Sequence, residues 1–394
     1  MKIMWFCIPA FGHTNPTIEV VRELVNRGNI IRYYSFEMFR DKIEDTGACF
    51  ISCDQYLPKL NKREEDALRK VSTTEMSVNA IRTTVLMDGM LEEEVKAFHP
   101  DLVVSDSVCF WGKLTAQKYN LPLVVSTTTF AFNQFSSRYM KYSFSEMADV
   151  ILGQRKVKEE LKKLTELGYH VKSALDLVTD KNDTDTIVYA SESFQPAAET
   201  FDKSHFCFIG PSVKSTKITR EENVRPFIYI SLGTVIKDHP EFYQKCMEAL
   251  ENEDVDVLIS CGTGMEPSDL GKIPANFKVE QSVNQMEVLG KANLFITHCG
   301  MNSASEGLYM GVPEILFPLT GEQQAVAQRV KEVGAGVMLD KKKAKSVTSI
   351  RTLVMEALNN KELQQAAQKM RADFLSCKGP KGAADFIEGK ENRA

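Results

Sequence analysis

The fold is decided by one stretch of the second half, LFITHCGMNSASEG at residues 294–307, with GVP beyond it at 311–313. The apolar run 294–296 predicts a buried strand, and the polar cluster after it starts a short helix that Asn302 or Ser303 can cap. Gly311 and Pro313 end that helix before the next expected strand. A helix N-terminus at the carboxyl edge of an α/β sheet favours an anion, so the stretch predicts a phosphate site.

The polar residues of this stretch suit a nucleotide diphosphate and its ribose. His298, Asn302 and Ser303 lie beside the expected phosphates, and Glu306, about one turn into the helix, can accept hydrogen bonds from a sugar diol. A capped helix alone would support no ligand, but the ordered set H-x-G-x-N-S-x-x-E-G followed by GVP favours one. On these residues the chain resembles nucleotide-sugar-dependent glycosyltransferases, most of all the bacterial macrolide-type UDP-glycosyltransferases, and the resemblance covers nearly the whole chain.

Length and composition restrict the class of protein. The chain has 394 residues, of which 43% are hydrophobic and 26% charged, with a net charge of −5. This length favours two domains, and the mild acidity without a strongly basic patch argues against a nucleic-acid partner. No apolar run approaches the roughly 20 residues of a membrane span, and MKIMWFCI at residues 1–8 predicts a first strand in place of a signal peptide. The nine scattered cysteines include no C-x-x-C pair, which indicates reduced thiols in a cytoplasmic protein.

Strands alternate with helices along both halves, which predicts an α/β fold with doubly wound parallel sheets. The first half has expected strands at 1–8, 30–34, 48–52, 102–105, 123–126 and 186–190, and helical stretches at 62–70, 78–97 and 138–174. The second half has expected strands at 227–231, 255–260, 277–280, 293–297, 314–317 and 337–339. The resemblance implies the GT-B architecture, two Rossmann-like domains facing a cleft. The implied parts are an acceptor-binding domain at 1–212, a linker at 213–225, a nucleotide-sugar-binding domain at 226–372, and a C-terminal helix at 373–394 that returns to the first domain.

Two residues of the first half are candidates for catalysis. His13 is expected in the loop after the first strand, before a helix with Pro16 at its first position, and a lone loop histidine is usually only solvated. P-x-x-G-H, followed by Pro and then Arg-Gly, resembles the opening of these glycosyltransferases, where that histidine is the general base. Asp106 follows a buried strand and could simply cap a helix starting near Phe110; the resemblance implies that it orients His13. Asn29 stands where the family often has His, at a structural position.

Aromatic residues are dense between residues 110 and 144, partly after a strand end on the ligand face. Core packing explains some of them, and we interpret the others as the wall of an apolar acceptor pocket. The residues assigned to acceptor binding are Phe110, Trp111, Thr128, Phe130, Phe132 and Phe135. In the family the stretch that matches 138–174 is variable and shapes the acceptor site.

The resemblance assigns the remaining donor contacts. SLGT at 231–234 can approach a diphosphate, although a tight turn fits it about as well. QSVNQ at 281–285 matches the base-binding segment, but Ser282 stands where many members have Trp and Asn284 where many have Pro; uracil is the predicted base. Glu322 and Gln323, in a loop before a helix at 324–332, match residues that bind the donor sugar. The donor-binding residues are Gly233, Thr234, Gln281, Ser282, Val283, Gln285, His298, Gly300, Met301, Asn302, Ser303, Glu306, Glu322 and Gln323.

No metal or cofactor is expected. Asp183-Thr184-Asp185 matches the metal-binding D-x-D of a different glycosyltransferase fold, but its polar surroundings favour a solvated loop, and the six histidines are dispersed. The implied activity is that of an inverting hexosyltransferase. It would move a sugar, glucose by expectation, from the co-substrate UDP-sugar to a hydroxyl of a phenolic, flavonoid, macrolide or terpenoid acceptor. The protein would be a monomer or weak homodimer.

Two alternatives stay open on the sequence. One is another GT-B enzyme, a lipid-linked sugar transferase or a nucleotide-sugar epimerase. The first would need a basic apolar patch near the first domain, and the second would not need His13 and Asp106. The other alternative is a nucleotide-sugar binding module without catalysis, which would keep the second-half motif and lose the base.

Overall fold

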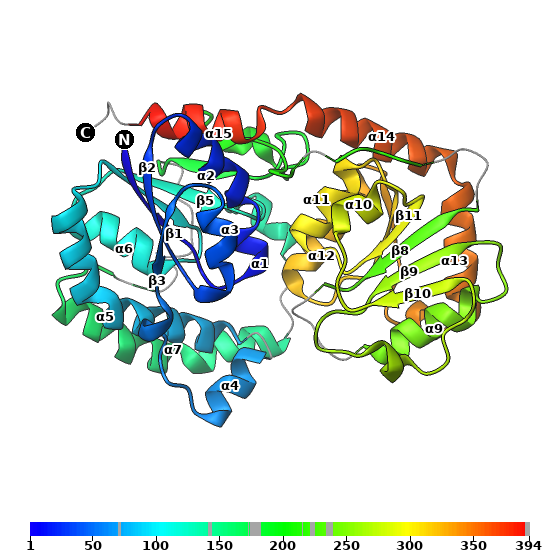
Figure 1. Cartoon of the computed structure of the whole chain (residues 1–394). Coiled ribbons are helices and arrows are strands. Elements are labelled where there is room, and N and C mark those ends of the chain that lie inside the picture. The colour runs from blue at the N-terminus through cyan, green and yellow to red at the C-terminus, as the bar shows by residue number, and fades with distance from the viewer. Residues whose placement is uncertain are drawn as a thin grey trace. The chain divides into compact units, whose positions relative to one another are not determined.

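A computed structural model describes residues 1–69, 72–140, 144–171, 173, 183–214, 216–220, 225–233 and 239–390. The chain divides into two compact units, which are considered separately (Figure 1). Unit 1 comprises Met1–Arg138, Tyr142–Ser212 and Cys377–Ala394, and unit 2 comprises Tyr139–Lys141 and Val213–Ser376.

Unit 1 is built on a seven-stranded parallel sheet with the order β3-β2-β1-β4-β5-β6-β7. Its strands are β1 (Lys2–Phe6), β2 (Ile30–Ser35), β3 (Cys49–Ser52), β4 (Leu102–Asp106), β5 (Leu123–Thr127), β6 (Thr186–Val188) and β7 (Phe206–Phe208). Its α-helices are α1 (Phe11–Thr14), α2 (Thr17–Asn26), α3 (Arg40–Glu44), α4 (Lys62–Arg69), α5 (Thr73–Phe98), α6 (Phe110–Lys118), α7 (Phe144–Glu166) and α15 (Gly379–Glu388).

Both faces of this sheet are buried, which explains why its strands are apolar without alternation. On β1, Ile3 and Trp5 join the core under α2, α3 and α15, whereas Met4 and Phe6 join the core under α5 and α6. All four side chains have no exposed surface. The sheet is therefore doubly wound, as the alternation of strands and helices predicts.

Unit 2 repeats this arrangement with a six-stranded parallel sheet of order β10-β9-β8-β11-β12-β13. Its strands are β8 (Phe227–Ser231), β9 (Asp256–Ser260), β10 (Phe277–Glu280), β11 (Leu294–Thr297), β12 (Glu314–Leu316) and β13 (Gly336–Met338). Its α-helices are α9 (Pro240–Leu250), α10 (Gln285–Leu289), α11 (Met301–Tyr309), α12 (Gly321–Glu332), α13 (Val347–Asn359) and α14 (Lys361–Ser376). On β8, Ile228 and Ile230 face one core and Tyr229 faces the other.

The predicted strands are present, each within two residues at either end. The sequence pattern does not predict β7, and it starts α5 five residues too late. Ser72 caps α5, since its hydroxyl accepts a hydrogen bond from the Glu75 N–H. The expected helix at 138–174 is shorter, 144–166, and residues 141–143, 172 and 174 of that range lie outside the described residues, as does Lys70 of the expected helix 62–70.

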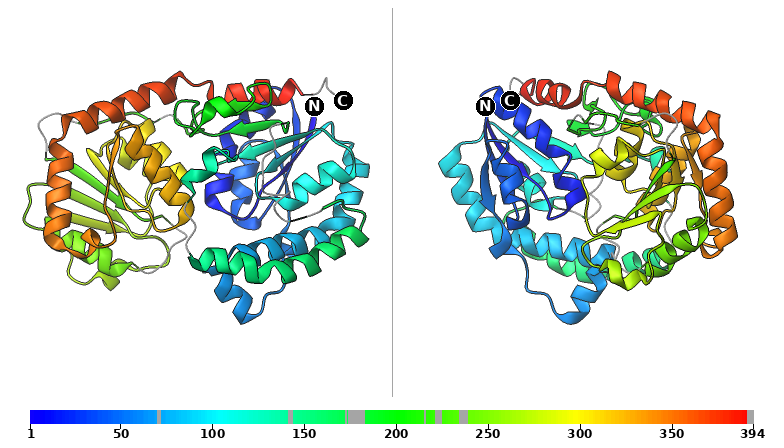
Figure 2. Two further views of the ribbon diagram at one scale, coloured as in Figure 1. Left: turned by 180° about the vertical axis from the view of Figure 1, so that it is seen from behind. Right: turned by 45° about the vertical axis from the view of Figure 1, so that its right-hand side comes forward.

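The chain end belongs to unit 1 through α15, which packs on α2 and β7 (Figure 2). Arg27 donates to Asp385 at 2.7 Å and to Glu388 at 2.9 Å. Asn29 donates to Glu388 at 2.8 Å, which gives this position a structural role. Asp185, the second acid of the D-x-D sequence, accepts a hydrogen bond from Lys390 and lies 2.8 Å from a ring nitrogen of His205.

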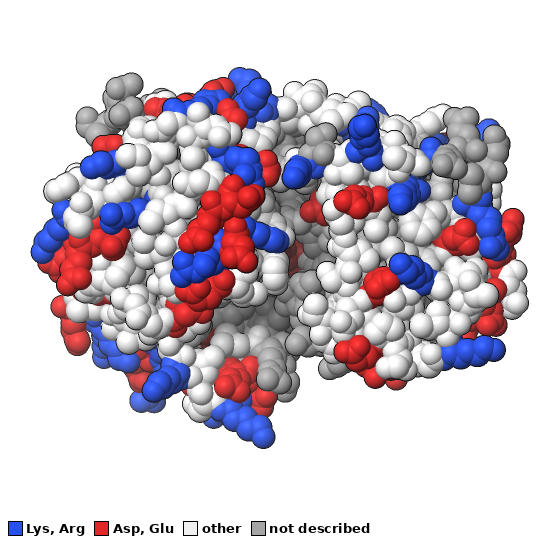
Figure 3. All heavy atoms as spheres, in the orientation of Figure 1, with Lys and Arg blue, Asp and Glu red and all other residues white. Residues whose placement is uncertain are grey.

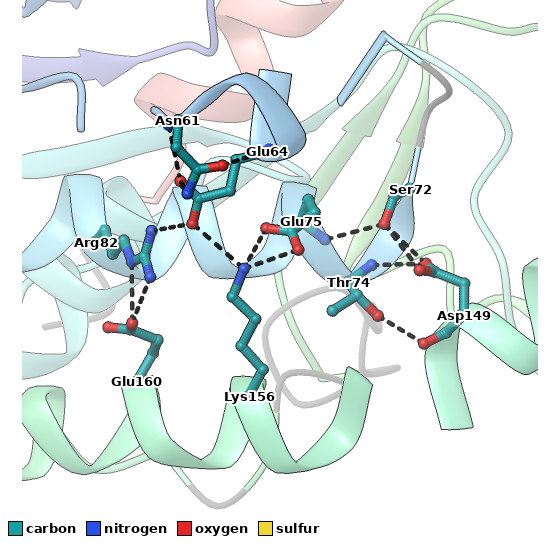
Figure 4. Close-up of polar contacts among 9 residues, drawn as sticks. All are labelled: Asn61, Glu64, Ser72, Thr74, Glu75, Arg82, Asp149, Lys156 and Glu160. Atoms are coloured by element: carbon teal, nitrogen blue, oxygen red, sulfur yellow. Dashed lines mark hydrogen bonds and ion pairs between the residues drawn. The ribbon is translucent and has the colours of Figure 1, made fainter. Parts of the chain in front are cut away.

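An ionic cluster fastens α7 to α4 and α5 (Figure 4). Lys156 of α7 donates to Glu75 at 2.7 Å and to Glu64 at 3.3 Å. Arg82 of α5 donates to both Glu64 and Glu160, each at 2.9 Å. Glu64 thus joins all three helices, and it is 9% exposed.

We expect Glu64→Gln to destabilise unit 1 by about 1–3 kcal/mol near pH 7. The Asn61 backbone N–H, followed by Arg82, lowers the pKa of Glu64 from 4.5 to about 2. A lowered folded-state pKa contributes stability above the unfolded value, and this stability is lost as the pH falls from about 4.5 towards 2. Urea unfolding of wild type and variant should therefore differ at pH 7 and converge only near pH 2. Glu65→Gln, an exposed neighbour, should match wild type at both values.

Charges of both signs are interspersed over the face of the molecule shown in Figure 3, without a field of one sign. On this face the charges give no electrostatic footprint for a nucleic acid. Of the helices that the structure describes, none combines the length and apolar character needed to span a membrane.

Candidate active site

In unit 1, His13 and Asp106 meet where the strand order reverses. β1 pairs with β2 on one side and with β4 on the other, with Phe6 opposite Ser105. His13 follows β1 and Asp106 ends β4, so both lie at the carboxyl edge of this switch point. Open α/β sheets bind ligands in the crevice that forms there.

The two side chains are hydrogen-bonded. His13 Nδ1 lies 2.7 Å from Asp106 Oδ2, and the other carboxylate oxygen accepts the Val108 N–H at 3.0 Å. Asp106 is fully buried, whereas His13 keeps a quarter of its side chain exposed. Because an ionised carboxylate only accepts hydrogen bonds, Nδ1 carries the proton, and Nε2 has the lone pair that a base needs. Thr128 Oγ1 lies 3.3 Å from the same Nδ1.

The local structure around the pair differs from the prediction in two ways. His13 lies in the short helix α1, not in a loop, and Pro16 is the N-cap of α2 instead of its first residue. Cys109, not Asp106, is the N-cap residue of α6, so the capping alternative for Asp106 does not hold.

Most of the predicted acceptor wall is core, which corrects that part of the interpretation. Phe110 packs with residues of α5 and α7, and Trp111 packs with residues of β1 and α5. Phe130 lies against Phe194, with ring centroids 5.3 Å apart. The exposed fractions of Phe110, Trp111 and Phe130 are 2%, 3% and 1%, too small for a pocket wall. Helix α6 turns its aromatic face towards neighbouring helices that local sequence cannot place.

The other predicted acceptor residues have different surroundings. Thr128 is 3% exposed and contacts the His13 ring, whereas Phe132 is partly buried and Phe135 is 50% exposed. Phe11, two residues before His13, has no role in the sequence prediction; it is 39% exposed and packs edge-on against Phe39. No spacing in the sequence distinguishes Phe11 from a core aromatic.

In unit 2, the opening stretch also lies at a switch point, because β8 pairs with β9 on one side and β11 on the other. Gly233 follows β8 and His298 follows β11. The chain enters α11 through Cys299, a non-glycine residue with a φ of 64°, whose N–H donates to Thr297 Oγ1 at 3.1 Å.

Gly300 is the N-cap of α11, not Asn302 or Ser303 as predicted, and as a glycine it supplies no side-chain cap to this end. Asn302 and Ser303 lie in the first turn, partly buried, and Met301 is buried. The first N–H groups of a helix have no acceptor within it, and an uncapped end presents them to a ligand. The helix N-terminus is therefore the candidate anion site of unit 2.

His298 lies between the two glycines of this site. A Cβ atom would come within 2.6 Å of His298 Nε2 at Gly233 and within 2.7 Å at Gly300, so both positions require glycine for this ring placement. Burial lowers the pKa of His298 to about 4, and the Ser231 backbone offsets part of this shift. The His298 Nδ1 atom is buried and has no hydrogen-bond partner among the described residues. The imidazole is therefore neutral near pH 7, a donor of one N–H.

Glu306 is held by an amide. Gln285 Nε2 donates to Glu306 Oε2 at 2.6 Å and lies 3.4 Å from Ser303 Oγ. Burial raises the pKa of Glu306, while the Gln285 hydrogen bond lowers it. The carboxylate thus sits one helical turn from the anion site, with one oxygen bound by protein.

Gly307 of the same motif is needed for packing. A Cβ at this position would meet Glu314 Oε1 at 2.3 Å and the Phe295 ring at 3.1 Å. Glu314 lies under the helix with no exposed surface, and burial raises its pKa well above the ordinary value. The glycine lets α11 approach the sheet closely.

The segment predicted to bind the base, residues 281–285, is partly exposed. Gln281 donates to Glu266 at 2.9 Å and to the Met265 carbonyl at 3.2 Å, Ser282 is exposed, and Val283 packs beside the Tyr229 core. No aromatic residue stands at Ser282.

The predicted sugar contacts lie at a helix end and not in a loop. Thr320 and Gln323 form a capping box that starts α12 at Gly321, and Glu322 is exposed in its first turn. The side-chain oxygen of Gln323, Oε1, accepts hydrogen bonds from two backbone N–H groups. A sugar hydroxyl could therefore be contacted by the side-chain nitrogen, Nε2. Thr234 lies outside the described residues. The described part of the chain has no group of three or more His, Cys, Asp or Glu arranged for a metal ion.

We expect Gly300→Ala to raise the donor KM and lower kcat, together reducing kcat/KM by roughly tenfold to a hundredfold, because the new methyl group displaces the His298 ring. Steady-state kinetics with varied donor would measure this. Gly89→Ala, in mid-α5 with nothing within 4 Å of the added Cβ, is the matched control and should leave kcat/KM unchanged. Wild-type kinetics in Gly300→Ala would contradict the assigned role of the ring.

Two doubly wound units, one with a hydrogen-bonded His–Asp pair and one with a helix N-terminus beside a carboxylate, define a GT-B glycosyltransferase. A family model described as UDP-glucoronosyl and UDP-glucosyl transferase matches residues 218–372. NDP-glycosyltransferase YjiC of Bacillus subtilis is 33% identical over 97% of this chain and 95% of its own length. Demethyllactenocin mycarosyltransferase of Streptomyces fradiae is 28% identical over 98% of this chain and 86% of its own.

A solved structure shares the whole fold. CalG4, the calicheamicin glycosyltransferase, aligns with a TM-score of 0.80 at 29% identity, over 100% of this chain and 98% of its own. The chain belongs to the UDP-glucoronosyl and UDP-glucosyl transferase family, and it transfers a sugar from a nucleotide sugar to an acceptor. The family and the fold predicted from the sequence are thereby confirmed.

Proposed function

We propose that the protein transfers glucose from UDP-glucose, with inversion, to a hydroxyl of a small apolar acceptor. The observation that carries the proposal is the 2.7 Å contact between His13 Nδ1 and the buried Asp106 carboxylate. This contact fixes the tautomer in which Nε2 accepts a proton. His13 then removes the hydroxyl proton as the acceptor oxygen attacks the anomeric carbon, and Asp106 stabilises the imidazolium.

The donor is assigned to unit 2. The diphosphate of the leaving group gains charge as the glycosidic bond breaks, and the α11 N-terminus with the neutral His298 N–H supplies donors to it. Glu306 accepts a hydrogen bond from the ribose. UDP is favoured because the description of the matching family names UDP-linked donors. We propose that these protein groups suffice without a metal, so that transfer proceeds at the same rate in excess EDTA.

The acceptor is assigned to unit 1. Phe11 shares α1 with His13 and exposes an apolar ring, and Phe132 and Phe135 follow β5 with part of their surface exposed. An apolar molecule carrying a hydroxyl, of the phenolic, flavonoid, macrolide or terpenoid kind, suits such side chains. The relatives that act on calicheamicin and demethyllactenocin support this choice.

The experiment is incubation with UDP-glucose, other UDP-sugars and dTDP-glucose, each with a panel of phenols, flavonoids, macrolides and terpenoids, read by mass spectrometry. A mass gain of one hexose from UDP-glucose is the expected result. Transfer only from the thymidine donor would refute uracil, and transfer only from another UDP-sugar would refute glucose. The His13→Ala protein is the control for non-enzymatic transfer.

A further inference from the structure

We propose that Tyr229 is a positioning residue of the donor site: its hydroxyl orients the Gln285 amide, which in turn holds the Glu306 carboxylate for the donor. The proposal rests on the proposed function, in which Glu306 accepts a hydrogen bond from the ribose of UDP. Tyr229 lies in β8, and its hydroxyl donates to Gln285 Oε1 at 3.1 Å. The other end of the same amide donates to Glu306 at 2.6 Å.

The direction of the chain of hydrogen bonds follows from chemistry. Gln285 Nε2 donates to Glu306 Oε2, so the NH₂ end of the amide faces Glu306. The carbonyl end then points at Tyr229 and needs a donor, which the phenol supplies. The reversed amide would place its oxygen against the Glu306 carboxylate, two acceptors in contact. The Gln285 side-chain amide has two orientations that differ only in the exchange of its oxygen and its NH₂ group. The Tyr229 hydroxyl therefore selects one of them.

Tyr229 is well placed to keep this role. It is 1% exposed, and its ring stacks on Phe295 with centroids 4.9 Å apart and an interplanar angle of 10°. Both rings come from adjacent strands, β8 and β11, so sheet pairing fixes their distance from the site. Burial raises the pKa of Tyr229 to about 12, and the phenol keeps its proton near neutral pH.

The competing explanation is that Tyr229 only fills the core under α10 and α11. Tyr229→Phe separates the two, because phenylalanine keeps the ring and its stacking and removes only the hydroxyl. Without that donor, the Gln285 amide can adopt both orientations. Its NH₂ group then faces Glu306 only part of the time, and the carboxylate is held less firmly. A lost neutral hydrogen bond predicts UDP binding about threefold to tenfold weaker.

The test is a double-mutant cycle on UDP affinity, measured by isothermal titration calorimetry with wild type, Tyr229→Phe, Gln285→Ala and the double variant. We expect Tyr229→Phe to weaken binding as stated and the double variant to match Gln285→Ala, because the hydroxyl acts through the amide. Tyr169→Phe removes another buried tyrosine hydroxyl, bonded to Asp88 in unit 1 at 2.6 Å, and should bind UDP like wild type.

Two results would overturn the positioning role: UDP affinity of Tyr229→Phe within twofold of wild type, or effects of the two substitutions that multiply in the double variant. If the two losses of affinity multiply in the double variant, Tyr229 acts independently of Gln285 and serves only in packing. Failure of wild type to bind UDP would overturn the proposed donor and the positioning role with it, so the two failures are distinguishable. Thermal unfolding of each variant shows whether a loss of binding reflects a loss of folded protein.

Discussion

His13→Ala should lower kcat by about 10²–10⁴ and leave UDP affinity unchanged. The imidazole is the group of unit 1 that accepts the acceptor's proton in this account, and the donor groups lie in unit 2. Asp106→Asn should cause a loss of similar size for a different reason. The Asn NH₂ can donate to Nδ1, which moves the ring proton to Nε2 and removes the base without removing the ring.

The measurement is kcat for glucose transfer with saturating donor and acceptor, paired with calorimetric UDP binding. His170→Ala, a change at an exposed histidine of unit 1, should behave as wild type. Transfer by His13→Ala at a rate near that of wild type would show that the base is another group. Full activity of Asp106→Asn would show that the tautomer does not matter.

His298→Ala should lower kcat by about 10²–10³, the usual cost of removing one donor to a developing negative charge. The ring is buried against Gly233 and Gly300, and its pKa of about 4 keeps it neutral, so it contributes an N–H and not a full charge. His298→Gln retains an N–H donor and should recover part of the loss.

The pH dependence provides a second check on this role. Because His298 protonates only near pH 4, the kcat/KM profile above about pH 5 should show no ionisation that is absent from His298→Gln. An inflection near neutral pH that disappears in His298→Gln would mean that the ring is charged in the working enzyme. Equal kcat in wild type and His298→Ala would remove the ring from leaving-group stabilisation.

The sequence predicts each residue of the two candidate sites separately, and the order of the strands explains why these residues meet. His13 and Asp106 are separated by 93 positions, but their strands are neighbours at the switch point. Local pattern gives the strand ends, while strand order depends on packing of the whole sheet. The same reasoning covers Gly233 and His298 in unit 2.

The sequence predicts where a residue lies on a strand or helix better than it predicts which side chains that residue contacts. Phe110 and Trp111 follow a strand end, as a pocket wall would, yet α6 turns Phe110 towards α5 and α7 and Trp111 towards β1 and α5. The sequence pattern predicts a loop at Glu322 and Gln323, whereas the capping box of Thr320 and Gln323 already starts α12 at Gly321. Tyr229 looked like an ordinary strand residue, since only the fold brings its hydroxyl to Gln285.

The central claim is a single displacement at the anomeric carbon, with the acceptor hydroxyl activated by His13. The most direct test is the anomeric configuration of the first product formed from UDP-α-glucose, determined by proton NMR. We expect a β-glucoside, because one attack from the face opposite UDP inverts the centre. An α-glucoside would contradict it, since retention requires a covalent glycosyl-enzyme intermediate or attack from the leaving-group face.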